Sequence, residues 1–452
     1  MHTEQPLKFD MINSKPPSDK RPFLDEKKHG AFEFEEESGG IEAYRLKAND
    51  LKVLILKEAA APVVTFMVTY HVGSRNESLG LTGATHFLEH LMFKGTERFN
   101  KITGTSVFNV LQRVGAEVNA TTWFDRTNYY ELLPKEHLAL AIEIEADRMR
   151  GARIAPDDLE SERTVILNEL DRGENDPTQK LYHAVWSSAF TAHPYHHPTI
   201  GWRSDVENVT EEGLRHFYNT FYWPNNATIS IIGDLDRSEV FDLVAHHFGQ
   251  IPKATKAIPD VHTSEPIQQG ERRVIVKQSG QLGAVMMAYK SPPGLDSDTD
   301  ALDVLSVVLT SGKSSRLYRR LTDNGLTTHL FSGSSRLRDP GLFYLFAMLA
   351  PDRTHDEVES AILDVFEAFK SEQISSDELQ RAKNQRKAQE AFGRDGPFAV
   401  ASQLNEAIAT GDWKLYTGMR ERIERITAED VQRVAQKYLV DDFLTVGNYV
   451  PT

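Results

Sequence analysis

The sequence predicts an α+β protein of two similar halves, each an antiparallel β-sheet covered by α-helices. Two observations support this fold class. Runs rich in Val, Ile, Thr and aromatic residues, which are typical of strands, occur between amphipathic stretches that are typical of helices. The same series of stretches then occurs a second time. The length of 452 residues also exceeds that of one ordinary domain, which is about 100–200 residues.

The chain divides into four predicted segments. Residues 1–39 are polar, contain several prolines and become acidic near their end, so they are predicted to form an extended N-terminal arm. Residues 40–250 form the first predicted domain, and residues 271–452 form the second. Between them, residues 251–270 contain three prolines and are predicted to form a linker.

The first domain contains its predicted elements in a clear order. Strands are expected over 41–72, followed by a helix that Thr82 can cap and Gly95 can end. A strand-like run over 119–134 comes next. Helical patterns then cover residues 135–151 and 155–173, and a strand over 227–236 closes the domain.

A repeat relates the two domains. The segment "AVMMAYKSPPG" of the second domain is similar to "VTFMVTYHVGS" of the first, and two helical stretches match in the same order. Tyr70 and Tyr289 are 219 positions apart, Leu159 and Leu379 are 220 apart, and Thr210 and Thr427 are 217 apart. Three registers this close to one another favour a duplicated domain. Chance likeness between amphipathic helices is the alternative explanation.

The two domains differ in their ionisable groups. Three such residues of the first domain have apolar or neutral counterparts in the second. The pairs are His86 and Leu305, His90 and Leu309, and Glu169 and Gln389. The first domain is therefore expected to carry the chemistry, and the second is expected to be a structural copy without a metal site.

Two histidines and a glutamate stand in the otherwise apolar stretch "THFLEHLMFKGT". On a helix, His86 and His90 lie one turn apart on the same face, with Glu89 beside them. Both imidazoles can therefore bind one metal ion. Catalytic zinc takes three protein ligands of this kind and lowers the pKa of a bound water to about 7. Glu89 can then accept the proton of that water.

The order H-x-x-E-H is the inverzincin signature, although so short a pattern is weak on its own. Two core histidines beside a surface glutamate are the alternative. A third ligand is expected downstream, where "ESERTVILNE" offers Glu162 and Glu169. These residues are seven positions apart and share one helix face, so that one can bind metal while the other orients a histidine. An ordinary solvated acidic face would give the same pattern.

Taken together, "HFLEHLMFKGT" and "ESERTVILNEL" resemble the M16 metallopeptidases, the family of pitrilysin, insulinase and mitochondrial processing peptidase. Glu169 follows His90 by 79 positions, which is similar to the family's spacing. "GAEVNATTWFDRTNYYELLP" and "AHPYHHPTIGW" are also similar to segments of the family. The likeness extends over residues 40–450 and is greatest to the short, processing-peptidase-like members. It implies the LuxS/MPP-like metallohydrolase fold.

The resemblance also implies roles for single residues. His86, His90 and Glu169 would bind one zinc ion per chain, Glu89 would be the general base and Glu162 a supporting acid. Asn119 and Ala120 would lie on an edge strand to which an extended peptide adds by main-chain hydrogen bonds. Phe93 would sit near the scissile bond, or else be a core aromatic residue. The neighbouring histidines His193, His196 and His197 are not assigned to a metal, because their proline-containing loop has no fixed helical geometry.

The second domain departs from the family pattern. Many members supply an arginine and a tyrosine to the substrate from this half, but Thr322 stands at the arginine position and Thr328 near the tyrosine position. The likeness therefore implies a heterodimer in which a homologous chain without the zinc motif supplies this clamp. A chain acting alone or as a homodimer is the alternative, with Arg319 or Arg320 as a local substitute.

Composition limits the remaining possibilities. The absence of cysteine excludes disulfides and cysteine-type zinc sites. The net charge of −15 makes nucleic acid an unsuitable partner. Such a charge is compatible with the attraction of basic substrates and equally with a role in solubility alone. No apolar run approaches the roughly 20 residues of a membrane-spanning helix, and no signal peptide is visible. A soluble protein of the cytoplasm or the periplasm is expected, and the sequence does not distinguish the two compartments.

The sequence thus predicts a zinc-dependent endopeptidase that cleaves unfolded peptides. Two alternatives remain. One is a non-catalytic structural or partner-binding subunit of the same fold. The other is a protein that binds zinc but cleaves nothing.

Overall fold

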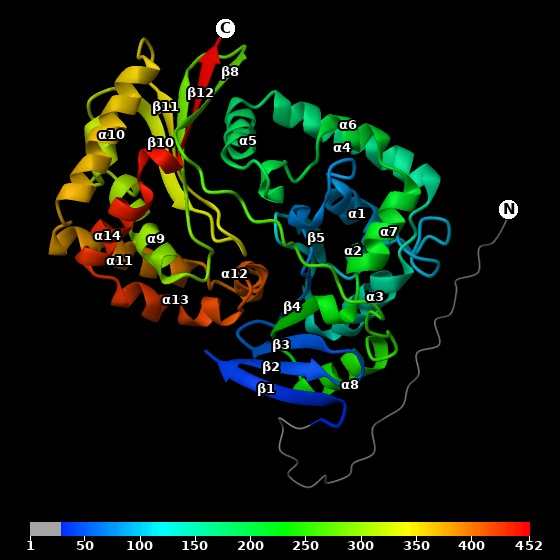
Figure 1. The fold of residues 1–452 in the computed structure, drawn as a ribbon. Helices are drawn as coiled ribbons and strands as arrows, with labels where there is room; N and C mark the ends of the chain where they lie inside the picture. Colours follow the sequence, from blue (N-terminus) through cyan, green and yellow to red (C-terminus); the bar gives the residue numbers. More distant parts are fainter. Residues whose placement is uncertain (1–28) are drawn as a thin grey trace, which may run out of the picture.

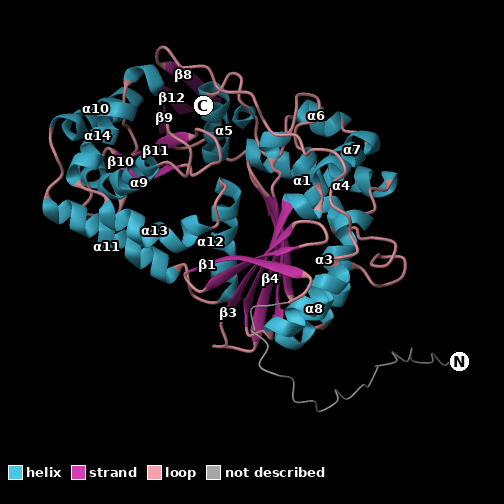
Figure 2. Ribbon diagram, turned by 60° about the horizontal axis from the view of Figure 1, so that its bottom comes forward, coloured by secondary structure: helices cyan, strands magenta, loops and turns pink. Residues whose placement is uncertain are grey.

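The computed structural model describes residues 29–452 and consists of two halves, each a β-sheet with helices packed on it (Figures 1 and 2). The predicted α+β fold class is confirmed. The sheets are largely antiparallel, but each contains one parallel pair of strands, which the sequence did not predict.

The first sheet has seven strands in the order β1-β2-β3-β7-β4-β6-β5. Their bounds in that order are Phe32–Ser38, Ile41–Leu46, Leu51–Lys57, Ala227–Gly233, Val63–Tyr70, Thr127–Pro134 and Glu117–Thr122. The parallel pair is β3 with β7, which joins the beginning of the domain to its end. Strand β5 lies at one edge of the sheet, and among the strands of the described part of the chain it pairs only with β6.

The second sheet has five strands in the order β10-β11-β9-β12-β8. Their bounds in that order are Thr327–Ser334, Leu342–Leu349, Ala284–Lys290, Leu444–Pro451 and Arg272–Gln278. This order repeats the series β5-β6-β4-β7-β3 of the first sheet, with the parallel pair in the same place. Identical topology in both halves excludes chance likeness between helices and confirms the predicted repeat.

Both halves contain helices. In chain order they are α1 Ala84–Met92, α2 Val107–Arg113, α3 Leu138–Gly151, α4 Pro156–Glu174, α5 Pro177–Ala189, α6 Arg203–Asn208, α7 Glu211–Phe221, α8 Arg237–His247, α9 Ser297–Thr310, α10 His355–Ser371, α11 Ser376–Phe392, α12 Pro397–Thr410, α13 Lys414–Arg425 and α14 Ala428–Tyr438. None of these helices is both long and apolar enough to span a bilayer.

The structure corrects the prediction of an extended arm over residues 1–39. Phe32–Ser38 form strand β1, which pairs antiparallel with β2. The acidic residues that suggested an arm are paired across the sheet, because Arg45 contacts both Glu33 and Glu35, at 2.9 and 3.2 Å. The rest of the predicted arm, residues 1–28, lies outside the described part of the chain. The other predicted domain boundaries stay predictions.

The zinc-motif helix also begins differently from the prediction. Gly83, with φ of 85°, is the residue before α1, and Thr82 does not cap it. The Thr82 hydroxyl instead donates a hydrogen bond of 2.7 Å to Asp205. Glycine is required at position 83 because an added Cβ would lie 2.5 Å from the Ile200 carbonyl oxygen. The predicted strand over 119–134 is likewise two strands, β5 and β6, joined by a turn.

One helix of each half packs on the sheet of the other half (Figure 1). Helix α5 of the first half packs on β8, β9 and β12 of the second sheet, whereas α12 of the second half packs on β4 and β7 of the first. The two helices occupy equivalent places in the repeat, since Pro177 and Pro397 each begin one of them. The apolar cores that result, around Trp186 and Leu404, contain side chains from both halves.

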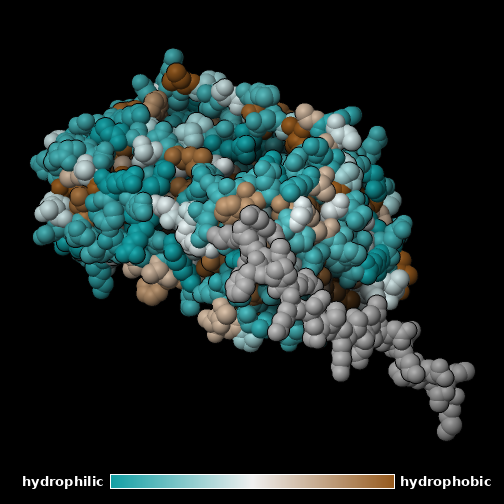
Figure 3. All heavy atoms as spheres, turned by 90° about the horizontal axis from the view of Figure 1, so that it is seen from below, coloured by the Kyte–Doolittle hydropathy of each residue, from teal (hydrophilic) through white to brown (hydrophobic). Residues whose placement is uncertain are grey.

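The face shown in Figure 3 is largely hydrophilic, with small apolar spots distributed over it. The buried clusters around α5 and α12 provide apolar contacts between the halves.

The exchange predicts that Leu404→Ala destabilises the whole chain. Leu404 is fully buried on α12 against the first sheet. Truncation of a buried leucine costs about 2–5 kcal/mol, since the cavity is only partly refilled. Urea unfolding should show this loss. The control Leu295→Ala, at a residue that is 41% exposed, should change stability by about 0.5 kcal/mol or less. Equal losses for the two variants would contradict the prediction.

Candidate metal centre

Helix α1 holds the zinc motif by burying its apolar side. Phe87, Leu88, Leu91 and Met92 are fully buried in the core of the first half. His86, Glu89 and His90 are half-buried on the opposite side of the helix. The spacing of the apolar residues thus fixes the direction in which the three ionisable side chains point.

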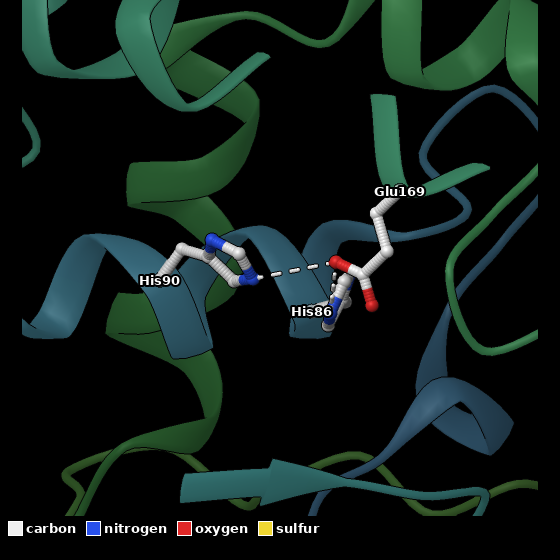
Figure 4. Close-up of side chains that lie close together, drawn as sticks. All are labelled: His86, His90 and Glu169. Atoms are coloured by element: carbon white, nitrogen blue, oxygen red, sulfur yellow. Dashed lines mark ion pairs between the residues drawn. The ribbon is translucent and has the colours of Figure 1, made fainter. Parts of the chain in front are cut away.

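Helix α4 brings the distal glutamate to the two histidines, as Figure 4 shows. The Glu169 carboxylate lies 3.8 Å from Nε2 of His86 and 3.9 Å from Nε2 of His90. All three ligand atoms lie within 4.8 Å of one another, and they are the one group of this kind in residues 29–452. Two ligands of a tetrahedral zinc ion are about 3.4 Å apart. The donor set therefore fits zinc with only small adjustments.

Glu162 holds the imidazole ring of His90. Its carboxylate lies 2.8 Å from Nδ1 of His90, which leaves Nε2 directed at Glu169. Lys94 forms an ion pair with the same carboxyl group. The hydrogen bond with His90, aided by Lys94 and opposed by burial, lowers the pKa of Glu162 to about 2. A carboxylate that holds the second nitrogen of a metal-binding histidine is a usual support of zinc sites.

His86 is held as a neutral imidazole. Burial, with a smaller effect of His90, lowers the pKa of His86 to about 3. Its Nδ1 atom is buried without a hydrogen-bond partner among the described residues. A neutral imidazole is the form that binds metal, so no proton has to leave His86 at neutral pH.

Glu89 stands beside the ligands and is held by a residue that the sequence did not indicate. The hydroxyl of Thr122, the last residue of β5, donates a hydrogen bond of 2.5 Å to Glu89. Burial raises the pKa of Glu89. A raised pKa suits a carboxyl group that takes up a proton and gives it back. The only sequence signal for Thr122 was its place in a predicted strand.

The predicted substrate residues lie in different surroundings. Asn119 is exposed and Ala120 is buried on the edge strand β5, where the amide of Ala120 bonds the side chain of Asn119 at 2.9 Å. Phe93 follows α1 and stacks on Phe108, with ring centroids 4.7 Å apart. Its other ring neighbour is Tyr129. This packing resembles that of a core aromatic residue, and the substrate roles of all three residues stay predictions.

A cavity of about 170 Å³ adjoins the metal centre. His86 and Glu169 form part of its wall, together with the aromatic side chains of Trp123 and Tyr182. His196 and His197 also line it, but His193 points elsewhere and lies 2.9 Å from Asp339 of the second half. The histidine-rich loop thus forms the wall of the cavity and a contact between the halves.

The stretch of the second half that departs from the family pattern lies around the short π-helical segment η5 (Tyr318–Thr322). The Thr322 hydroxyl lies 3.1 Å from that of Thr327, and Thr328 is exposed on β10. Arg319 is exposed, and Arg320 lies 3.3 Å from Asp364 on α10. Helix α10 packs on the face of the second sheet opposite α5. Arg320 is therefore directed away from the face that α5 covers.

Comparison with known proteins agrees with this geometry. Residues 52–202 match the model described as Insulinase (Peptidase family M16), and residues 208–386 match the Peptidase M16 inactive domain. The zinc protease PqqE of Helicobacter pylori is 31% identical over 88% of this chain and 90% of its own length. The chain belongs to the M16 peptidase family.

Two further relatives support the assignment. The crystal structure of a protease from Helicobacter pylori has a TM-score of 0.86 and 31% identity, over 91% of this chain and 99% of that one. A probable mitochondrial-processing peptidase subunit beta from Arabidopsis thaliana is 26% identical over 89% of this chain and 77% of its own length. The M16 fold and the two-half architecture are thus shared with solved and curated members.

The geometry predicts that His86→Ala and His90→Ala each lose zinc. Each variant removes one of the three donor atoms, and a catalytic zinc site has no spare protein ligand. Elemental analysis after dialysis should find one zinc per chain in the parent protein and much less in both variants. His216→Ala, on α7 outside the cluster, is the matched control and should keep its zinc. Retention of a full equivalent by both variants would show that the ligand assignment is wrong.

Proposed function

We propose that the chain is a zinc-dependent endopeptidase that cleaves unfolded peptides at the centre formed by His86, His90 and Glu169. One observation carries the proposal. The three donor atoms converge within 4.8 Å, and Glu89 stands on the same turn of α1, held by Thr122. A ligand triad with an adjacent general base is what metal-assisted hydrolysis requires.

Each side chain has a defined part in the proposed reaction. His86, His90 and Glu169 would hold one zinc ion, which supplies Lewis-acid chemistry and lowers the pKa of water to about 7. Glu89 accepts a proton from the attacking water and delivers it to the leaving amine. Thr122 fixes the carboxyl group for both transfers. Glu162 holds Nδ1 of His90 and so maintains the direction of Nε2.

The edge strand β5 supports a peptide as substrate. Within residues 29–452 its outer main-chain groups have no strand beside them, and Thr122 at its end contacts the proposed base. An extended peptide can therefore add to β5 as a further strand next to the metal centre. Binding through the main chain favours unfolded segments, because a folded substrate has already used those groups.

A non-catalytic subunit is the second candidate function. The match of residues 208–386 to an M16 domain described as inactive favours it for the second half. The first half differs, since its complete set of zinc-site residues converges in one place. A protein that binds zinc without cleaving peptides would share that geometry. Only an activity assay distinguishes such a protein from a peptidase.

We further propose that a homologous chain without the zinc motif completes the substrate site. Thr322 and Thr328 cannot supply a cation or a phenol to the substrate carbonyl. The relative from Arabidopsis thaliana is named as a subunit of a processing peptidase, which supports a two-chain arrangement. A homodimer or a chain that acts alone remains the competing arrangement.

The mechanism predicts that Glu89→Gln keeps zinc but loses nearly all cleavage. The amide retains the shape of the side chain but cannot accept a proton. Loss of a general base lowers the rate by about 10²–10⁴-fold. Cleavage of a quenched fluorescent peptide should be measured on zinc-replete samples. Glu160→Gln, an exposed change on α4, should leave the rate unchanged. Parent-like activity of zinc-replete Glu89→Gln would contradict the mechanism.

The absence of the family's arginine and tyrosine at positions 322 and 328 predicts that the isolated chain is a weak peptidase. One missing electrostatic contact to the reacting carbonyl lowers the rate by about 10²–10³-fold. Addition of a homologous chain that carries the arginine and the tyrosine should restore the rate and form a complex in light scattering. Full turnover by the chain alone that is lost in Arg319→Gln or Arg320→Gln would instead establish a local clamp.

A further inference from the structure

The end of strand β5 is held from both faces of the first sheet. Its last two residues, Thr121 and Thr122, direct their side chains to opposite faces, as successive residues of a strand do. Thr122 contacts Glu89 of α1 on one face. On the other face, Thr121 contacts Arg126, which closes the turn between β5 and β6. One residue thus joins the strand to the proposed base, and the next joins it to Arg126.

Arg126 connects the two strands of this hairpin. Its Nη1 atom donates hydrogen bonds of 3.0 Å to the carbonyl oxygen and of 2.5 Å to the hydroxyl of Thr121. The same atom donates a hydrogen bond of 3.1 Å to the side-chain oxygen of Asn128 on β6. Thr121 and Asn128 are opposite each other in the sheet. One side of the guanidinium group therefore contacts both strands where the hairpin ends.

The second half holds the other side of the guanidinium group. Nε and Nη2 of Arg126 donate hydrogen bonds of 3.0 and 2.5 Å to Glu406 of α12. Glu406 also accepts a hydrogen bond from Asn405, whose side-chain oxygen accepts one from Thr69 of β4. The Arg126 side chain is only 10% exposed, and all three of its nitrogens already donate within the protein. Arg126 is therefore placed to act through its neighbours and not on a substrate.

An edge strand needs such additional contacts near its end. Within residues 29–452, β5 is six residues long and pairs with β6 alone. Local opening is easiest where few contacts hold the main chain, and Thr122 is the last residue of this strand. A displacement of the base by about 1 Å can lower a rate by roughly 10²-fold. The hydrogen bond between Thr122 and Glu89 is thus only as precise as the end of β5.

We propose that Arg126 is a positioning residue that fixes the end of β5 and thereby keeps Thr122 against Glu89. Glu406 of the second half holds Arg126 in the orientation that this requires, because the planar guanidinium group can bond on both sides at once. The proposal rests on the peptidase function proposed above, since Glu89 is the base of that reaction. It gives the second half a part in the reaction through α12.

The first test compares Arg126→Gln in two backgrounds, the parent chain and Thr122→Val. In the parent, Arg126→Gln should lower kcat about tenfold, the size expected for hydrogen bonds to a charged group. In Thr122→Val, which has already lost the contact with Glu89, it should lower kcat less than about twofold. An equal loss in both backgrounds would overturn the proposal, because a general weakening of the fold does not depend on Thr122.

The second test examines the link between the halves. Glu406→Gln should lower kcat in the parent and have no further effect in Arg126→Gln. The matched control is Lys414→Gln, which removes an ion pair of 3.0 Å between α13 and Glu36 on β1, at the opposite edge of the sheet from β5. This control should leave kcat unchanged. Parent-like turnover by Glu406→Gln would overturn the role assigned to the second half.

Glu406→Gln also provides a test if Arg126→Gln does not fold. Its side chain is half-exposed and its replacement leaves the arginine in place. The loss of kcat caused by Glu406→Gln is then compared between the parent and Thr122→Val. A loss confined to the parent supports the proposal, and an equal loss in both backgrounds overturns it.

Hydrogen exchange, measured by mass spectrometry, tests the strand without any reaction. The fragment that contains Glu117–Thr122 should exchange about tenfold faster in Arg126→Gln than in the parent, and Lys414→Gln should leave its exchange unchanged. Unchanged exchange in Arg126→Gln would overturn the proposal. If no sample cleaves peptide, with or without a homologous chain, the peptidase function is refuted, and faster exchange still supports the positioning of β5. Cleavage with equal losses in both backgrounds does the reverse.

Discussion

The reciprocal packing of α5 and α12 is the contact on which the rest of the structure depends. Each sheet has one face covered by helices of its own half, and the exchanged helix of the other half packs on the opposite face. Removing either helix would expose apolar side chains such as Met67 or Met286 to water. At about 25 cal/mol per Å² of apolar surface, that exposure outweighs any single polar contact between the halves.

The exchange also reaches the candidate metal centre. Glu169 lies near the end of α4, and α5 begins only three residues after α4 ends at Glu174. Because α5 is anchored on the second sheet, the end of α4 is held from the opposite half. His86 and His90 are fixed by the core of the first half, and Leu159, Ile166 and Leu170 of α4 are buried in the same core, where α4 packs on α1. The distance between the histidines and Glu169 is thus set within the first half, and α5 adds a second anchor at the end of α4.

Polar contacts between the halves reinforce this arrangement. Arg75 lies 2.5 Å from Asp339, and the buried Asp125 accepts hydrogen bonds from the Tyr195 hydroxyl and from the amide of Arg338. His193 bonds Asp339 as well, which explains a histidine that the sequence left without a role. Buried charges of this kind cost free energy unless each has its partner. They therefore fix the relative position of the halves more than they add to stability.

The part of the site that sequence could predict is the part that depends on local geometry. His86, Glu89 and His90 share a helix, so their spacing alone places them together, and the spacing of Glu162 and Glu169 works in the same way. Thr122 comes from a strand edge, and only the tertiary fold brings it to Glu89. For the same reason the sequence did not predict strand β1. Glu33 and Glu35 have the pattern of a solvated acidic run, and their partner Arg45 comes from another strand.

Local sequence patterns also could not predict the exchange of α5 and α12 between the halves. Both helices are amphipathic, and the sequence contains no sign of which sheet each one covers. The repeat was visible, yet it is compatible with two separate domains as well as with two interlocked ones. Only the paired cores around Trp186 and Leu404 decide between those arrangements.

The divergence of the two halves follows from the cost of burying polar atoms. In the first half, Nδ1 of His86 is buried without a partner, which is unfavourable unless the other side of the ring gains an interaction. A metal bound at the proposed site would provide that interaction and would link the site to the stability of the fold. In the second half, the corresponding Leu305 and Leu309 are fully buried and carry no such cost.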